Sequence, residues 1–131
     1  MNERYAGLVN NFDNYAYHFL GCGAIGSAAA VTMVKMGAKC IHLYDMDKVE
    51  RPNVGVSVYD TNDINKDKVT ALKDRLLLID PYLEVHTHHG MFEQYKPEDN
   101  NVVILGFDSM ESRLYAVEQI LKHKKPDVLI D

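Results

Sequence analysis

The segment GCGAIG at residues 21–26 places three glycines in G-x-G-x-x-G spacing between two apolar patterns. The run YAYHFL (15–20) before it predicts a strand. Residues 24–36 after it are mostly apolar or good helix formers, and Gly37 follows where a left-handed helix end belongs. A glycine turn between strand and helix lets backbone N–H groups approach phosphate oxygens. The pattern predicts a nucleotide-binding turn; the alternative is that the glycines serve only a tight turn and close packing.

The rest of the chain continues this alternation of short apolar runs and helical patterns. Further strands are expected at 39–44, 83–88, 101–106 and 127–131. We predict an α/β fold: a Rossmann-like, doubly wound, mainly parallel sheet with helices on both faces.

Two further helices are expected between these strands. In the first, Asn65 is the expected N-cap, Asp80 and Pro81 end the helix, and the apolar face carries Val69, Leu72, Leu76 and Ile79. In the second, the apolar face carries Met110, Leu114, Val117 and Leu121.

Composition limits the class of protein. With 131 residues and 47% hydrophobic content, the chain predicts one domain over 1–131. Because the sequence ends in or just after an apparent strand, the chain is either a small member of its class or the N-terminal part of a longer fold. A net charge of −5 without a basic cluster argues against nucleic acid as a partner. The absence of a long apolar run argues against a membrane span, and we expect a cytoplasmic protein.

An acidic residue follows the second predicted strand. Asp45 lies after CIHLY, at the place where Rossmann-like domains carry a carboxylate that accepts hydrogen bonds from ribose hydroxyls. The polar segment 45–64 that follows has no sustained period and predicts a long loop. By itself, this arrangement would favour NAD.

Four stretches resemble motifs of the ThiF/MoeB/HesA adenylyltransferases, in the ubiquitin-activating-enzyme superfamily. The stretches are DMDKVERPNV (45–54), DINKDKVTAL (63–72), IDPYLEV (79–85) and GFDSMESR (106–113), in the order in which the family has them. The resemblance covers roughly residues 15 to 131. It implies binding of ATP and Mg²⁺ and adenylation of a carboxylate, typically the C-terminal glycine of a ubiquitin-like or sulfur-carrier protein. It also implies a homodimer.

The resemblance assigns roles to residues of this chain. Backbone groups in the turn would contact the phosphates, and Asp45 would bind the ribose with Asp47 near it. Asn53 and Lys68 would contact phosphate oxygens, and Asp108 would bind Mg²⁺; Lys68 and Asp108 are the residues expected to act in catalysis. The residues of the turn given this role are Gly21, Gly23, Ala24 and Gly26.

Each of these side chains also has a plain structural interpretation. Asp108 with Glu111 could form a helix cap, and Lys68 could be solvated in the first turn of a helix. Asn53 after Pro52 is a common turn residue. Asp47 is equally well explained as a solvated loop acid.

The chain departs from the family pattern at two expected arginines. Val56 stands three residues after Asn53, where the family usually has arginine, and Gly7 stands at another arginine position near the N-terminus. Loss of one transition-state charge contact commonly costs on the order of 100-fold in rate. Arg51 is a candidate substitute. A degenerate member that binds nucleotide or a partner without catalysis is therefore the main alternative, and an NAD-dependent oxidoreductase or S-adenosylmethionine methyltransferase is the second.

The cysteines and histidines predict no further chemistry. Cys22 and Cys40 lack C-x-x-C spacing and are interpreted as reduced thiols, Cys22 as filler of the glycine loop. HTHH supplies three histidines, of which two, His86 and His88, share a strand face. Without a cysteine or carboxylate partner at suitable spacing, we interpret them as solvent-facing rather than as a metal site.

Overall fold

Five parallel strands form one sheet in the order β3-β2-β1-β4-β5. The structure is a computed structural model that describes residues 14–90, 101–107, 110–122 and 128–130. The order reverses at β1, which lies between β2 and β4, so the sheet has the switch point of a doubly wound fold. The predicted Rossmann-like parallel sheet is confirmed. The strands are β1 (Ala16–Leu20), β2 (Cys40–Tyr44), β3 (Glu84–His88), β4 (Asn101–Leu105) and β5 (Val128–Ile130).

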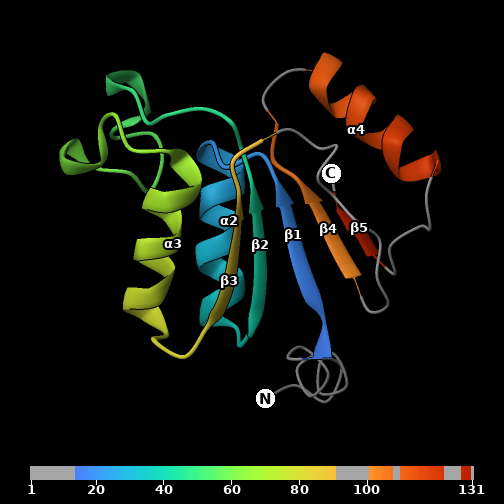
Figure 1. The fold of residues 1–131 in the computed structure, drawn as a ribbon, viewed down its shortest axis with the longest axis horizontal. Coiled ribbons are helices and arrows are strands. Elements are labelled where there is room, and N and C mark those ends of the chain that lie inside the picture. The colour runs from blue at the N-terminus through green and yellow to red at the C-terminus, as the bar shows by residue number, and fades with distance from the viewer. Residues whose placement is uncertain (1–13, 91–100, 108–109, 123–127, 131) are drawn as a thin grey trace.

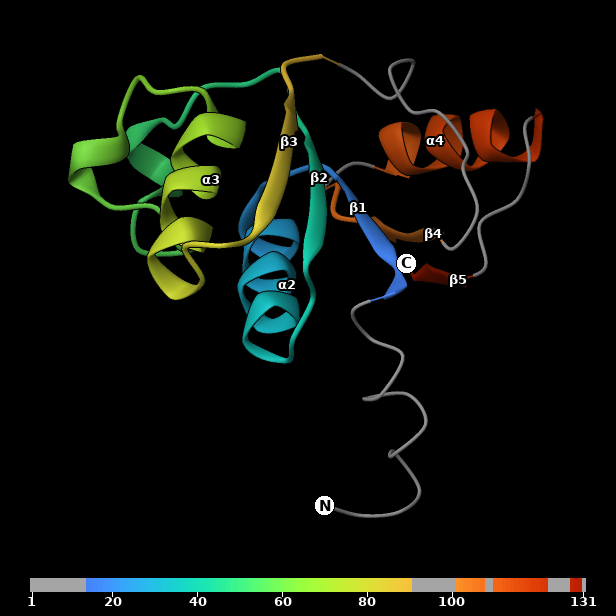
Figure 2. The ribbon, with the colours of Figure 1, turned by 60° about the horizontal axis from the view of Figure 1, so that its bottom comes forward.

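Helices lie on both faces of this sheet, as predicted. Helices α2 (Ala24–Lys35) and α3 (Lys68–Ile79) cover one face, and α4 (Met110–Lys122) lies on the other (Figures 1 and 2). Alternate strand residues separate the two cores because successive side chains point to opposite faces. The larger core includes Phe19, Ile41, Ile104, Ala30 and Leu72, and the second comprises Leu20, Tyr44, Val103, Leu105, Ala116 and Ile120. In the described part of the chain, no helix is long and apolar enough to cross a membrane.

The start of α3 differs from the prediction. Asn65 has a φ of +74° and is not the cap; Asp67 precedes the first helical residue. Asparagine tolerates this left-handed conformation, and its backbone N–H donates to the Val49 carbonyl at 2.8 Å. Asn65 therefore turns the chain before the helix rather than starting it.

Two residues of the predicted apolar faces are exposed. Ile79 is 39% exposed because the buried face of α3 is completed by Ala71 instead. Leu114 is 62% exposed because α4 turns Ala116 and Ile120 toward the sheet. In both helices an alanine on the inner face lets the helix backbone approach the sheet. The spacing of apolar residues along the sequence does not predict which position such a small residue takes.

Three glycines bring the β1–α2 turn against the end of β4. A Cβ on Gly106 would lie 2.6 Å from the Gly21 carbonyl oxygen and 2.8 Å from the Gly26 Cα. Gly21 has a φ of +100°, and a Cβ on Gly26 would also meet the Gly21 carbonyl. The third glycine of the motif thus packs helix against strand, as in dinucleotide-binding folds.

The segment between β2 and α3 is irregular, as predicted, but it is anchored to α3. It contains the short 3₁₀ turns η3 (Arg51–Asn53) and η4 (Thr61–Asp63). The Arg75 guanidinium contacts the carboxylates of Asp63 at 2.6 Å and Asp60 at 2.7 Å. Although burial opposes ionisation of Asp63, the Asp60 N–H and Arg75 hold the pKa of its carboxyl below the usual value.

We expect Asp63→Asn to lower the free energy of unfolding by about 1–3 kcal/mol at pH 7, because it weakens charged hydrogen bonds to Arg75. A carboxyl whose pKa is depressed in the folded state stabilises above its unfolded value of about 3.9 and loses this effect as pH falls through the folded value. The difference between variant and wild type should therefore shrink in acid below about pH 4. Urea unfolding at both pH values measures it, with the exposed Asp74→Asn as control.

We expect Gly106→Ala to lower the free energy of unfolding by about 1–3 kcal/mol, because the new methyl group requires a backbone shift. Gly37→Ala is the control, since Gly37 has a φ of +113° but a Cβ added there would meet nothing within 4 Å. Its cost of about 1 kcal/mol is conformational only. Urea unfolding measures both variants, and equal losses of unfolding free energy in Gly106→Ala and Gly37→Ala would show that the crowding at Gly106 is not important for stability.

Candidate functional site

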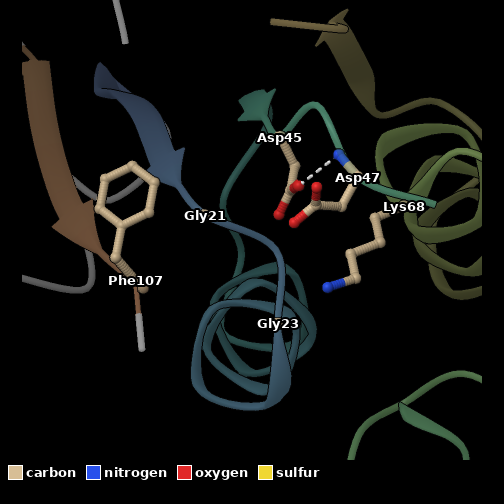
Figure 3. A pocket seen from close by; sticks show the side chains of 7 residues that line it. Gly21, Gly23, Asp45, Asp47, Lys68 and Phe107 are labelled. Carbon is tan, nitrogen blue, oxygen red and sulfur yellow. Dashed lines mark hydrogen bonds between the residues drawn. The ribbon is translucent and has the colours of Figure 1, made fainter. Parts of the chain in front are cut away.

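A cavity of about 180 Å³ opens at the carboxyl ends of the central strands. Ligands of doubly wound folds bind at this edge, beside the switch point. Figure 3 shows the glycine turn on one side of the cavity, Phe107 on another, and the two aspartates and the lysine facing them. The lining residues are Gly21, Gly23, Asp45, Asp47, Lys68, Gly106 and Phe107.

The N-terminus of α2 meets this cavity without a side-chain cap. Gly23 is the N-cap residue, and as a glycine it has no side chain that could accept from the first N–H groups of the helix. The first turn also carries no acidic residue. Uncapped N–H groups and the positive end of the helix dipole together favour an anion, as in phosphate-binding turns.

Asp45 ties the glycine turn to the loop after β2. One carboxylate oxygen accepts from the Cys22 N–H at 2.8 Å, and the other accepts from the Asp47 N–H at 2.8 Å. Each carboxylate oxygen has a further lone pair, so the half-buried side chain can still accept from a ligand hydroxyl. Asp45 therefore both shapes the turn and lines the cavity.

Lys68 supplies the cation of the cavity. It is the first residue of α3, and its N–H donates to the Asp47 carbonyl at 3.0 Å, which fixes the helix start beside the loop. Its ammonium group reaches toward the glycine turn (Figure 3). Within the described residues it makes no ion pair, and its side chain lines the cavity.

Tyr59 and Cys22 hold the backbone of the glycine turn in place. The buried Tyr59 hydroxyl donates to the Cys22 carbonyl at 2.6 Å, with the Lys68 carbonyl at 3.4 Å. Burial, with Asp45 nearby, raises the pKa of the Cys22 thiol, and burial also raises the pKa of Tyr59. Cys22 is therefore a buried, protonated thiol, consistent with its interpretation as filler, and both cysteines are reduced.

The structure brings five of the predicted site residues to the cavity and leaves others elsewhere. Ala24 begins α2, and Gly26 is buried in the glycine packing. Asn53 is not among the lining residues: its side-chain oxygen accepts from the Glu50 N–H at 2.7 Å in a local cap. Asp108 lies outside the described residues, next to the lining residue Phe107. The five at the cavity are Gly21, Gly23, Asp45, Asp47 and Lys68.

The structure describes only one of the two residues that stand at the expected arginine positions. Val56 is 69% exposed. Gly7 lies outside the described residues. Arg51, the candidate substitute, is exposed in η3 and does not line the cavity.

Sequence reasoning missed three residues of this region. Gly106 and Phe107 were recognised only as part of a motif, although a glycine directly after a buried strand indicates close packing. Tyr59 carries no sequence signal, because its partner is a backbone carbonyl 37 residues away.

Comparison with known sequences extends over most of the chain. The ThiF family pattern matches residues 8–129. A probable molybdopterin-synthase adenylyltransferase of Gracilaria tenuistipitata var. liui is 28% identical over 81% of this chain and 32% of its own length. Ubiquitin-like modifier-activating enzyme 5 of Caenorhabditis elegans is 29% identical over 63% of this chain and 20% of its own. The chain thus spans a third or less of these relatives.

Solved structures agree with the fold. The E. coli tRNA N6-threonylcarbamoyladenosine dehydratase TcdA superposes with a TM-score of 0.83 at 23% identity, over 96% of this chain and 55% of that one. E. coli MccB with ATP superposes with a TM-score of 0.76 at 21% identity, over 88% and 36%. Because the family pattern spans nearly the whole chain and the sheet agrees with these folds, the protein belongs to the ThiF family.

Proposed function

We propose that this chain binds Mg-ATP in the cavity and adenylates a carboxylate, namely the C-terminal glycine of a ubiquitin-like or sulfur-carrier protein. The observation that carries the proposal is the meeting of an uncapped helix N-terminus, Lys68 and the Asp45 carboxylate at one sheet edge. Relatives named as an adenylyltransferase and as modifier-activating enzymes support the type of reaction. Two solved structures with similar folds contain ATP.

The reaction joins a carboxylate oxygen to the α-phosphorus and breaks the bond from that phosphorus to its bridging oxygen, so pyrophosphate leaves. Two anions must approach each other, and the site needs positive charge and oriented N–H donors more than a proton-transferring base. In this proposal, the α2 N-terminus and Lys68 offset phosphate charge, and Asp45 accepts from the ribose.

Mg²⁺, when bound, would neutralise charge on the phosphates. The lining carboxylates suit a hard cation, since oxygen ligands are those that Mg²⁺ prefers. Asp47 is exposed and lines the cavity. Asp108 remains our proposed magnesium ligand and Asn53 a proposed phosphate contact, both by family position.

A homodimer and a cytoplasmic location are part of the same proposal. The family resemblance supports the homodimer, and the sequence composition is the ground for proposing the location. Light scattering of the purified chain tests the first: a monodisperse monomer would contradict it.

We expect Lys68→Ala to weaken Mg-ATP binding by about 10- to 100-fold, the usual cost of losing a charged hydrogen bond. Isothermal calorimetry measures the affinity, and an identical titration with NADH tests the oxidoreductase alternative. Lys73→Ala is the matched control, because Lys73 lies on the same helix away from the cavity. Equal losses in both variants, or heat with NADH in place of ATP, would contradict the assigned site.

We expect Val56→Arg to raise ATP–pyrophosphate exchange by about 10-fold or more, because it returns a cation to the family's arginine position. Val56 is 69% exposed, so the larger side chain fits without disturbing the core. Exchange is measured with candidate carrier proteins ending in glycine. If ATP binds but neither wild type nor Val56→Arg exchanges pyrophosphate, the chain is the degenerate, binding-only member.

A further inference from the structure

The sheet face opposite α2 and α3 carries a row of histidines at one register. His18, His42 and His86 stand side by side on β1, β2 and β3. Their rings stack, with centroids 4.4 Å apart for His18 and His42 and 4.5 Å apart for His42 and His86. The row runs from a fully buried imidazole at the centre of the sheet to an exposed one at β3.

The inner end of this row is satisfied by protein. The His18 Nε2 bonds to the Asn101 Oδ1 at 3.1 Å, and its Nδ1 bonds to the Tyr44 hydroxyl at 2.9 Å. Because the Asn101 oxygen can only accept, Nε2 carries the hydrogen and Nδ1 accepts from Tyr44. His18 therefore has no nitrogen left for a ligand.

The outer end has a different set of neighbours. Cys40 and Glu84 are paired with each other two residues before His42 and His86 along β2 and β3, so all four side chains lie on the same face. The Glu84 Oε2 lies 2.9 Å from the Cys40 Sγ and 3.0 Å from the His86 Nε2. A thiol, two imidazoles and a carboxylate thus share one partly exposed patch, and three ligand atoms, from Cys40, His42 and His86, lie within 4.8 Å of one another.

We propose that Cys40, His42 and His86 bind a zinc-type divalent transition-metal ion, with Glu84 as the fourth ligand. A thiolate with imidazoles and a carboxylate is a donor set that zinc accepts, and bonds of about 2.0–2.3 Å require ligand atoms about 3.4–3.6 Å apart. Closing from the present spacing requires turning the stacked rings toward a common ion. His86 can make this rotation because its side chain is 48% exposed.

A neighbouring histidine orients one of the ligands. The His88 Nε2 lies 3.2 Å from the His42 Nδ1. When the His42 Nδ1–H donates to His88, the His42 Nε2 lone pair is available to the ion, the usual outer-shell arrangement of a metal-bound histidine. Binding releases the Cys40 thiol proton to solvent as the sulfur–metal bond forms. The patch begins at the amino ends of β2 and β3, whereas the cavity lies at the carboxyl ends of the strands. The proposal therefore does not depend on adenylation.

The test is titration of the full chain with Co²⁺ and Zn²⁺ in the absence of nucleotide. We expect one tightly bound ion, with the sulfur-to-cobalt absorption band of a thiolate ligand, displaced by Zn²⁺. Cys40→Ser should abolish the band, and His86→Gln should weaken binding at least about 10-fold. Both positions are partly or fully exposed, so both variants should fold.

His89→Ala is the matched control, because His89 lies next to this strand but pairs with Asp67 at 3.3 Å. It should bind as wild type does. The proposal is overturned if wild type shows no thiolate band, if Cys40→Ser keeps it, or if His89→Ala weakens binding as much as His86→Gln. The row would then serve only to pack the sheet face.

Discussion

The close approach of β1 to β4 at the switch point governs the rest of this structure. Gly21, Gly26 and Gly106 meet backbone to backbone with no room for a side chain. This contact holds the first turn of α2 at the sheet edge, where its N–H groups face outward. A bulkier residue at any of the three would separate the helix from the sheet, and the N-terminus of α2 from the strand ends that carry Asp45 and Phe107.

A second group of contacts arranges the loop around this turn. Asp45 accepts from two backbone N–H groups, Tyr59 donates to the Cys22 carbonyl, and Arg75 holds the loop carboxylates. Polar groups of a long loop need partners in order to be buried, and here the partners belong to the elements that form the site. The loop is therefore held in place by the same elements that form the cavity.

The sequence predicted the elements better than their details. All five strands and three described helices lie where apolar runs, glycines and prolines predicted them, because these signals act locally. The Asn65 cap was wrong, since a left-handed asparagine and a capping asparagine look alike without the chain path. The exposure of Ile79 and Leu114 depends on how each helix is rotated against the sheet. At the site, Asp45 and Lys68 could be selected from motif spacing, whereas Tyr59 and the union of Cys40 with His86 depend on tertiary contacts that no local pattern encodes.

The order in which the strands are paired in the sheet also bears on how the chain folds. The hydrogen bond between His18 and Asn101 joins residues 83 apart, and the pairing of β1 with β4 closes a loop of similar size. Contacts between such distant segments form slowly, because closing the intervening loop costs conformational entropy before the contact contributes any stabilisation. The helix at the glycine turn can form locally, but the cavity is complete only once β4 has paired with β1, because Gly106 and Phe107 after β4 also line it. A ligand that binds in this cavity would therefore bind only to a chain in which this pairing has formed.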